Sequence, residues 1–454
     1  MKKFRIEKDS LGEVKAPERA LYGAQTQRAI DNFSISGLVM PERFIRSLGL
    51  IKAAAAKANA ELNALDDKLA DGIYNAAMSI ADGQYMDQFP VDIFQTGSGT
   101  SSNMNANEVI SSLASKQLKQ TVHPNDHVNC SQSSNDVIPS AIHLSAMLAI
   151  EQQLLPAIDQ LQTTIKSREK ELADQVKTGR THLMDAMPLS FAQELSAWRA
   201  QLELGRLRII DTQKRVCQLA QGATAVGTGI NAPASFSDVF CRKLSALTHC
   251  EFIPAENLFS ALSSQDTMVE LSGQLKALAV SLMKIANDLR WMNSGPLSGV
   301  GDISLKALQP GSSIMPGKVN PVVPEAVAMA AAQIMGNDTT VAVAGQSGNF
   351  QLNVMLPVIA YNVLQSIELA ANSCAALAKT SITDFVVNKT NVEASLSRNP
   401  ILITALNREI GYSKAAEIAK RAYREGRPII DVAAEMTDID KTRLQQMLDP
   451  KNLL

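Results

Sequence analysis

Hydroxyl, amino and amide side chains gather in one stretch of the sequence, residues 309–321, with Glu325 just beyond it. Two serines are adjacent at 312–313, and Lys318 and Asn320 stand two residues apart. Two glycines and three prolines in the same stretch forbid a regular helix, so it is predicted to be a loop of unusual backbone geometry. Two hydroxyls, an ammonium and a carboxamide on one loop can hold an anion and attack it. A plain connector between helices would explain the composition equally well.

Three further stretches, residues 95–103, 131–136 and 178–188, are also rich in small hydroxyl and amide residues. Each lies at the end of a predicted helix. Together with residues 309–321 they could surround a small polyanion, because neutral donors orient an anion while one cation supplies charge. The side chains with these two tasks would be Lys318 for charge and Thr100, Ser133, Asn135, Thr181 and Asn320 for orientation.

His182 lies in the third of these stretches, beside a threonine and close to an arginine and an aspartate. Histidine transfers protons near neutral pH, so this side chain is the natural candidate for a general acid or base. The alternative is a structural histidine at a helix end, which would be preferred if the other polar stretches were absent.

Nucleotide and metal sites are not supported by the motifs that first suggest them. Residues 311–318 resemble a phosphate loop, but five residues separate the two glycines and Val319 stands where serine or threonine is required. Residues 227–232 match a dinucleotide fingerprint but follow a predicted helix where a strand is needed. His123 and His127 are four residues apart, yet a proline and an asparagine between them favour a turn. We expect no metal ion and no cofactor.

The balance of charge excludes several classes of partner. The chain has 454 residues, 43 basic and 45 acidic side chains and a formal net charge of −2. It therefore has no global field to attract nucleic acid or an acidic membrane surface. Its five cysteines are scattered without paired spacing, which fits reduced thiols, and the N-terminus has no apolar export segment. We expect a cytoplasmic protein that binds neither nucleic acid nor a membrane.

Apolar residues recur at helical spacing along most of the chain. A hairpin of two helices is predicted from Phe44 to Ala58 and from Asp66 to Ile80, and another helix over about 104–118. A pattern of more than thirty residues follows Pro139, with a kink at Pro156. Further long helices are predicted over about 190–220, 264–292, 321–340 and 355–379.

The fold class is therefore predicted to be mainly α, with a bundle of five long helices as its centre. Strand-like alternation is nearly absent, apart from a short strand pair expected in an irregular arm before residue 44. Length and composition suggest three domains. These are a mostly helical domain over 1–136, the long-helix bundle over 137–390 and a small helical domain over 391–454.

The segment Gly311–Pro321 is similar to the signature of the fumarase/aspartase superfamily, and the other polar stretches resemble its remaining active-site segments. The resemblance covers nearly the whole chain. Gly179-Arg180-Thr181-His182 is similar to the pattern of class II fumarases, whereas aspartate ammonia-lyases carry glutamine at the position of His182. His123-Pro124-Asn125-Asp126 resembles the second dicarboxylate site of class II fumarases, although a simple structural turn explains it as well.

Two departures from the fumarase pattern leave fine specificity open. Met184 and Met187 replace the polar residues common in this loop of fumarases. Val322-Val323-Pro324 replaces a more polar sequence found in some of them and is equally at home in aspartases.

The resemblance implies reversible anti hydration of fumarate to (S)-malate through an aci-carboxylate carbanion. Ser312 would be the base that removes the carbon-bound proton, and Lys318 and Asn320 would hold the carboxylate where charge develops. His182, paired with Glu325, would move the proton to or from water. The substrate-binding residues implied are Ser98, Gly99, Thr100, Ser133, Ser134, Asn135, Thr181, Ser313, Lys318, Val319 and Asn320.

The resemblance also implies a homotetramer. In this superfamily the long helices of four subunits form a common core, and each active site takes segments from three subunits. An aspartate ammonia-lyase is the alternative within the same class of enzymes. A non-catalytic structural protein is the alternative outside it, because the superfamily has supplied lens crystallins.

Overall fold

Helices dominate the computed structural model, which describes residues 3–454. This part of the chain forms two compact units. The first combines residues up to Pro156 with Leu207–Ala277 and Gln333–Ala370, and the second combines Ala157–Arg206, Leu278–Ala332 and Ala371–Leu454. All sheets among the described residues are two-stranded. The mainly α class is therefore confirmed, while the division into three domains stays a prediction.

The first unit begins with the predicted strand pair, followed by short and medium helices. β1 (Phe4–Asp9) pairs antiparallel with β2 (Gly12–Pro17). The helices are α1 (Ala24–Asn32), α2 (Glu42–Glu61), α3 (Asp67–Ala81), α4 (Thr100–Leu118), α8 (Phe236–Thr248) and α9 (Leu258–Ser263). The minor strands are β5 (Gln218–Leu219) with β6 (Ile253–Pro254), and β8 (Gly348–Asn349) with β9 (Leu352–Asn353). The prediction of an irregular arm before residue 44 missed α1, whose small buried face gives no clear apolar period.

The predicted hairpin is formed by α2 and α3. Asp66 caps α3 by accepting from the backbone N–H groups of Lys68 and Leu69 at 3.0 and 3.2 Å. The two helices approach closely at Gly49, where an added Cβ would lie 2.7 Å from the Ala77 carbonyl oxygen. Only glycine fits there, so this residue fixes the separation of the two helices.

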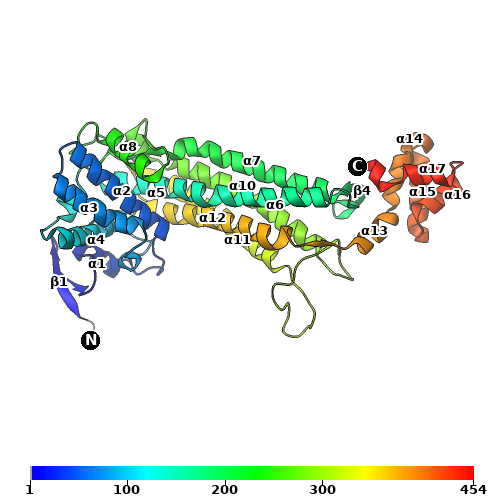
Figure 1. Ribbon diagram of the computed structural model, residues 1–454, viewed down its shortest axis with the longest axis horizontal. Helices are drawn as coiled ribbons and strands as arrows, with labels where there is room; N and C mark the ends of the chain where they lie inside the picture. The colour runs from blue at the N-terminus through cyan, green and yellow to red at the C-terminus, as the bar shows by residue number, and fades with distance from the viewer. Residues whose placement is uncertain (1–2) are drawn as a thin grey trace. The chain divides into compact units, whose positions relative to one another are not determined.

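Five long helical stretches occur within residues 3–454, at the predicted places (Figure 1). They are α5 (Ser134–Ala149) continuing into α6 (Leu155–Glu171), α7 (Phe191–Val216), α10 (Asp266–Met292), α11 (Val322–Gly345) and α12 (Leu356–Ala376). A wide π-helical turn over Ile150–Leu154 joins α5 to α6. Pro156 follows it and cannot donate an N–H to the preceding turn, so the helix is irregular where the kink was predicted.

Polar contacts join neighbouring long helices inside each unit. In the second unit Arg199 on α7 pairs with Glu169 on α6 at 2.7 Å, and Trp198 Nε1 donates to Asp288 on α10 at 3.3 Å. In the first unit Lys276 on α10 pairs with Asp338 on α11 at 2.5 Å. Asn337 on α11 donates to Gln365 Oε1 on α12 at 2.9 Å. Buried apolar side chains such as Leu202 on α7 and Leu282 on α10, both 0% exposed, supply the core of the long-helix packing.

The stretch 178–188, predicted to be a loop, is a β-hairpin in the second unit. β3 (Val176–Thr181) pairs antiparallel with β4 (Met184–Ser190). The two turn residues, His182 and Leu183, have φ values of 56° and 59°. A two-residue hairpin turn requires positive φ, and asparagine or glycine usually supplies it. Neither is present here, so the local sequence gave no hairpin signal.

The second unit ends in short helices around a small core. β7 (Ile303–Ser304) pairs with β10 (Val386–Val387), and α13 (Lys389–Ser397) follows. The remaining helices are α14 (Asn407–Ile410), α15 (Tyr412–Glu425), α16 (Ile429–Met436) and α17 (Lys441–Met447). Leu406, Ile418, Val432 and Leu444, each 0% exposed, form the centre of this core.

One helical stretch, Ser134–Glu171, is long and apolar enough to cross a membrane. In its most apolar window 67% of the residues are buried inside the protein. Its apolar character therefore serves the bundle.

Candidate functional site

In the first unit, the starts of α4 and α5 bring predicted substrate-binding hydroxyls together. Thr100 Oγ1 lies 2.8 Å from Ser98 Oγ and 2.7 Å from Ser134 Oγ, so three hydroxyls form one hydrogen-bonded chain. Gly99 caps α4 with φ 72°, and an added Cβ would meet Ile138 at 2.8 Å. Only glycine allows the two helix starts to lie this close.

The stretch 131–136 is fixed by a capping box at the start of α5. Ser133 Oγ accepts from the Asn135 N–H at 3.2 Å, and Asp136 Oδ1 accepts from the Ser133 N–H at 2.9 Å. Asp136 Oδ2 also accepts from the backbone N–H groups of Gly222 and Thr224 at 3.0 and 2.9 Å. Burial raises the pKa of this fully buried carboxyl to about 7, against the effect of these hydrogen bonds. The carboxyl group of Asp136 thus fixes the stretch 131–136 by hydrogen bonds to three backbone N–H groups.

The stretch 309–321 in the second unit contains neither helix nor strand, as predicted. Ser312 Oγ accepts from the backbone N–H groups of Ile314 and Met315 at 3.3 and 3.2 Å. A simple serine turn forms the same bonds, and these two donors would stabilise negative charge on the oxygen if it lost its proton. Ser313 and Lys318 are exposed on the same loop.

The loop closes on itself at Gly311. An added Cβ there would lie 1.9 Å from the Lys318 carbonyl oxygen, so the crossing requires glycine. Asn320 Nδ2 donates to the Gly311 carbonyl oxygen at 2.7 Å. Asn320, predicted to hold a substrate carboxylate, therefore uses one of its two donors to keep the loop closed.

Four of the predicted residues line a single hollow of about 440 Å³ in the second unit. These are Lys318, Val319, Asn320 and Glu325, the last in the first turn of α11. The end of α10 supplies Asn287 and Arg290, which were not predicted. Arg290 adds a second exposed cation and donates to Asn287 Oδ1 at 2.9 Å. An arginine in the last turn of a long helix gave no signal by itself, since such residues usually face solvent.

Thr181 and His182 lie at the tip of the β3–β4 hairpin, both exposed. Within the described residues no hydrogen bond or ion pair joins His182 to Glu325, so their pairing stays a prediction. Positive φ at His182 is uncommon for a non-glycine residue and costs about 1–3 kcal/mol. The surrounding structure must therefore hold the hairpin firmly.

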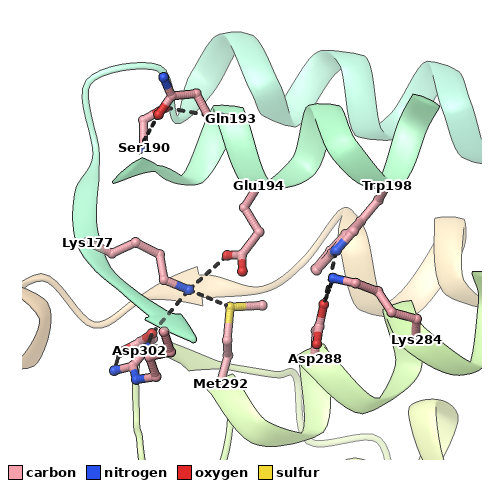
Figure 2. A network of polar contacts seen from close by, with 10 residues as sticks. Lys177, Ser190, Gln193, Glu194, Trp198, Lys284, Asp288, Met292 and Asp302 are labelled. Carbon is pink, nitrogen blue, oxygen red and sulfur yellow. Dashed lines mark hydrogen bonds and ion pairs between the residues drawn. The ribbon is translucent and has the colours of Figure 1, made fainter. Parts of the chain in front are cut away.

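A buried ion cluster holds this hairpin (Figure 2). The Arg180 guanidinium binds both Asp302 oxygens at 2.7 and 3.1 Å. Lys177 Nζ lies 3.2 Å from Asp302 and 2.8 Å from Glu194, and it donates to Met292 Sδ at 3.1 Å. Lys177 and Asp302 are 3% and 2% exposed. The cluster therefore ties β3 to α7, to the end of α10 and to the segment before β7. Asp302 was not predicted, because nothing near it in the sequence announces a partner.

The predicted second-site turn is a single π-helical turn, Pro124–Val128, in the first unit. His123 Nδ1 accepts from the Asp126 N–H at 3.1 Å. The same Nδ1 atom lies 3.2 Å from Asp126 Oδ2, so His123 contacts both the backbone and the carboxylate of Asp126. His123, Pro124 and Asn125 line a cavity of about 760 Å³ that also contains Thr100. The turn and the start of α4 thus share one cavity.

Comparison with known proteins shows one consistent relationship. A family model described as "Lyase" matches residues 12–336, and one described as "Fumarase C C-terminus" matches residues 402–454. A Pseudomonas aeruginosa protein named fumarate hydratase class II 2 is 59% identical over 449 residues, which cover 99% of this chain and 98% of the relative.

Two further proteins agree. A Xylella fastidiosa protein named fumarate hydratase class II is 58% identical over 451 residues, covering 99% of this chain and 95% of the relative. The crystal structure of a class II fumarase from Schistosoma mansoni superposes with a TM-score of 0.96 at 37% identity, covering 99% of each chain. The superfamily inferred from residues 311–321 is thereby confirmed, and the chain belongs to the class II fumarate hydratase family.

Proposed function

We infer that the protein catalyses the reversible hydration of fumarate to (S)-malate, an activity of the tricarboxylic acid cycle. The observation that carries this inference is the relationship to class II fumarate hydratases over 99% of the chain. The geometry of Ser312 supports it, because two backbone N–H groups at 3.2–3.3 Å stabilise a charged oxygen there. An aspartate ammonia-lyase is not favoured by these relatives.

In the direction of malate dehydration, the Ser312 alkoxide takes a proton from the carbon next to one carboxylate. The electron pair left on that carbon spreads into the carboxylate, which becomes a dianionic aci-acid. Lys318 and Asn320 stabilise this charge as it develops, so they act in the transition state more than in the ground state. The carbon–oxygen bond to the hydroxyl on the neighbouring carbon then breaks.

His182, supported by Glu325, gives a proton to the departing hydroxyl, which leaves as water and yields fumarate. Hydration is the reverse sequence. Because the two proton-transfer groups come from different loops, they can act on opposite faces of the substrate, as anti addition requires. The hydroxyl and amide groups of Thr100, Ser133, Ser134, Asn135, Thr181 and Ser313 would orient the two carboxylates, together with Ser98, Gly99 and Val319.

The assembly proposed is a homotetramer in the cytoplasm, with each site built from three subunits. Large apolar side chains stand exposed on the long helices of the second unit, among them Leu204 (52%), Val280 (53%) and Met329 (69%). Exposed apolar rows on helices indicate a surface that another copy covers. Sedimentation combined with activity assays tests this, and fully active monomers would contradict it.

The decisive assay offers malate and aspartate separately and follows fumarate absorbance. Turnover of malate alone is expected; turnover of aspartate alone would establish the ammonia-lyase instead. Ser312→Ala is expected to lower kcat on malate by about 10³-fold, in the range of a lost general base. Ser397→Ala, at an exposed serine of α13, is the matched control and should leave kcat unchanged. Full malate turnover by Ser312→Ala would refute the assignment of the base.

A further inference from the structure

A lysine without any exposed surface lies beside the substrate-binding loop of the first unit. Lys52 is on α2 and is 0% exposed. Its Nζ donates to Asn129 Oδ1 at 2.9 Å and to Gln132 Oε1 at 3.1 Å, both uncharged acceptors. In the part of the chain that the structure describes, it forms no ion pair; the charged group that acts on it is Asp136 of α5. Burying an ammonium group without a carboxylate contact is unfavourable, so a function should compensate for it.

Asn129 connects Lys52 to α4. Its Oδ1 also accepts from Asn103 Nδ2 at 3.2 Å and from Asn107 Nδ2 at 3.1 Å, so three donors converge on one oxygen. Its Nδ2 donates to the Gln132 carbonyl oxygen at 3.0 Å. Asn103 and Asn107 are buried one turn apart on the helix that begins at Thr100. The network thus joins the two helix starts that carry substrate-binding hydroxyls.

A second residue of α2, Asn59, also holds residues 129–132. Asn59 Nδ2 donates to the Cys130 carbonyl oxygen at 2.9 Å, and its Oδ1 accepts from Ser131 Oγ at 2.7 Å. Ser131 itself has φ 61°, a conformation that needs such support. Lys52 and Asn59 are seven residues apart, two helical turns, and therefore lie on one face of α2. This face holds residues 129–132, which lead directly into Ser133.

A bound anion would change the protonation of Lys52. Burial lowers its pKa to about 7, and Asp136 opposes this effect only in part. A dicarboxylate bound at the start of α5 would favour the charged form of a nearby buried amine. The neutral hydroxyls and amides of Ser133, Ser134 and Asn135 supply no charge of their own.

We propose that Lys52 is a positioning residue for substrate: it fixes residues 129–132 through Asn129 and Gln132, and its buried ammonium adds positive potential beneath the loop that binds the dicarboxylate. This role rests on the proposed function. It acts on bound substrate and transition state alike, so it contributes to KM more than to kcat.

The test compares Lys52→Met with Lys57→Met. Lys57 lies on the same helix, but its side chain is 37% exposed and pairs with Asp71 on α3 at 2.5 Å, so it is a matched control outside the network. Lys52→Met is expected to raise KM for malate and the Kd of succinate, a dicarboxylate that does not react, by about tenfold or more. The kcat should stay within about threefold, and Lys57→Met should match the wild type in all three values.

A second variant covers failure of Lys52→Met to fold. Asn129→Asp keeps the shape of the side chain and places a carboxylate against Lys52, which neutralises its charge toward substrate. It should weaken succinate binding in the same direction. Wild-type KM and succinate Kd in a folded Lys52→Met protein, or in Asn129→Asp, would overturn the proposal. Succinate binding is measured by calorimetry and does not depend on turnover. A wild-type protein inactive on malate would refute the proposed function, and the effect of Lys52 on succinate binding could still be measured.

Discussion

Asp302→Asn is the substitution that most directly tests how the His182 hairpin is held in place. Asparagine has the same size, so the change removes one negative charge and replaces one acceptor oxygen by an NH2 donor. Arg180 keeps at most one of its two bonds at 2.7 and 3.1 Å, and Lys177 loses the carboxylate charge that it faces at 3.2 Å. Both Asp302 and Lys177 are almost completely buried, so water cannot replace the lost partner.

The magnitude follows from this burial. Removing one member of a buried ion pair costs about 3–5 kcal/mol, because the other charge is left uncompensated. Lys177 keeps Glu194 at 2.8 Å, and Arg180 is 21% exposed, which favours the lower end, about 3 kcal/mol. Part of this loss falls on the hairpin, whose turn residues already have unfavourable φ values. A displacement of His182 by about 1 Å would lower kcat by about 10²-fold.

The assay is malate dehydration with kcat and KM determined separately, together with thermal unfolding. Asp288→Asn is the control, because Asp288 also contacts a lysine and Trp198 but lies on α10 away from the hairpin (Figure 2). Its pair with Lys284 is solvent-accessible and should contribute no more than about 1 kcal/mol. A folded Asp302→Asn protein with wild-type kcat would refute the reasoning, since the cluster would then not position the proton-transfer group.

Two other predictions concern a loop crossing and a partly buried histidine. Gly311→Ala places a Cβ 1.9 Å from the Lys318 carbonyl oxygen and should lower kcat/KM on malate by about 10²-fold. The control Gly336→Ala, in α11, has open space around the added Cβ and should leave kcat/KM unchanged. Equal activity of the two variants would contradict the prediction. Burial lowers the pKa of His143 from 6.5 to about 4. Between these two pH values the unfolded state binds a proton that the folded state does not. The free energy of unfolding therefore falls by about 1.4 kcal/mol for each unit by which the pH decreases. Urea unfolding at pH 7.5 and 5.5 should show a smaller acid-induced loss for His143→Gln than for the wild type or for the exposed-site variant His249→Gln, and parallel losses in all three proteins would exclude this cause.

The long helices could be predicted from sequence because their apolar period is local and sustained. The β3–β4 hairpin could not, since its two turn residues lack the usual asparagine or glycine and its main support, Asp302, lies more than a hundred residues away. The stretch that carries Ser312 could be predicted to be a loop from its composition, although a plain connector would explain that composition equally well. The stretch 95–103 was also predicted to be a loop, but α4 begins within it, at Thr100. Lys52 did leave a signal: it stands at helical spacing from the buried residues Leu48 and Asn59, on the apolar face of α2. Lysine is rarely buried at a position of this kind unless a specific interaction requires it.

The predicted substrate-binding groups depend on other residues that fix their backbone. Most of the groups predicted to touch substrate are small hydroxyl and amide side chains at helix starts and turns, half-buried at Thr100 and Ser133 and exposed at Thr181. Such short side chains depend on neighbouring residues to hold them in place. The loop 131–136 is fixed by Asp136 and Lys52, and the hairpin tip by Asp302. The loop 309–321 is different, because the side-chain hydrogen bonds of Ser312 and Asn320 stay within the loop, such as Asn320 to Gly311. A loop held by its own hydrogen bonds can move at low cost, which would suit a segment proposed to carry the base and to admit substrate.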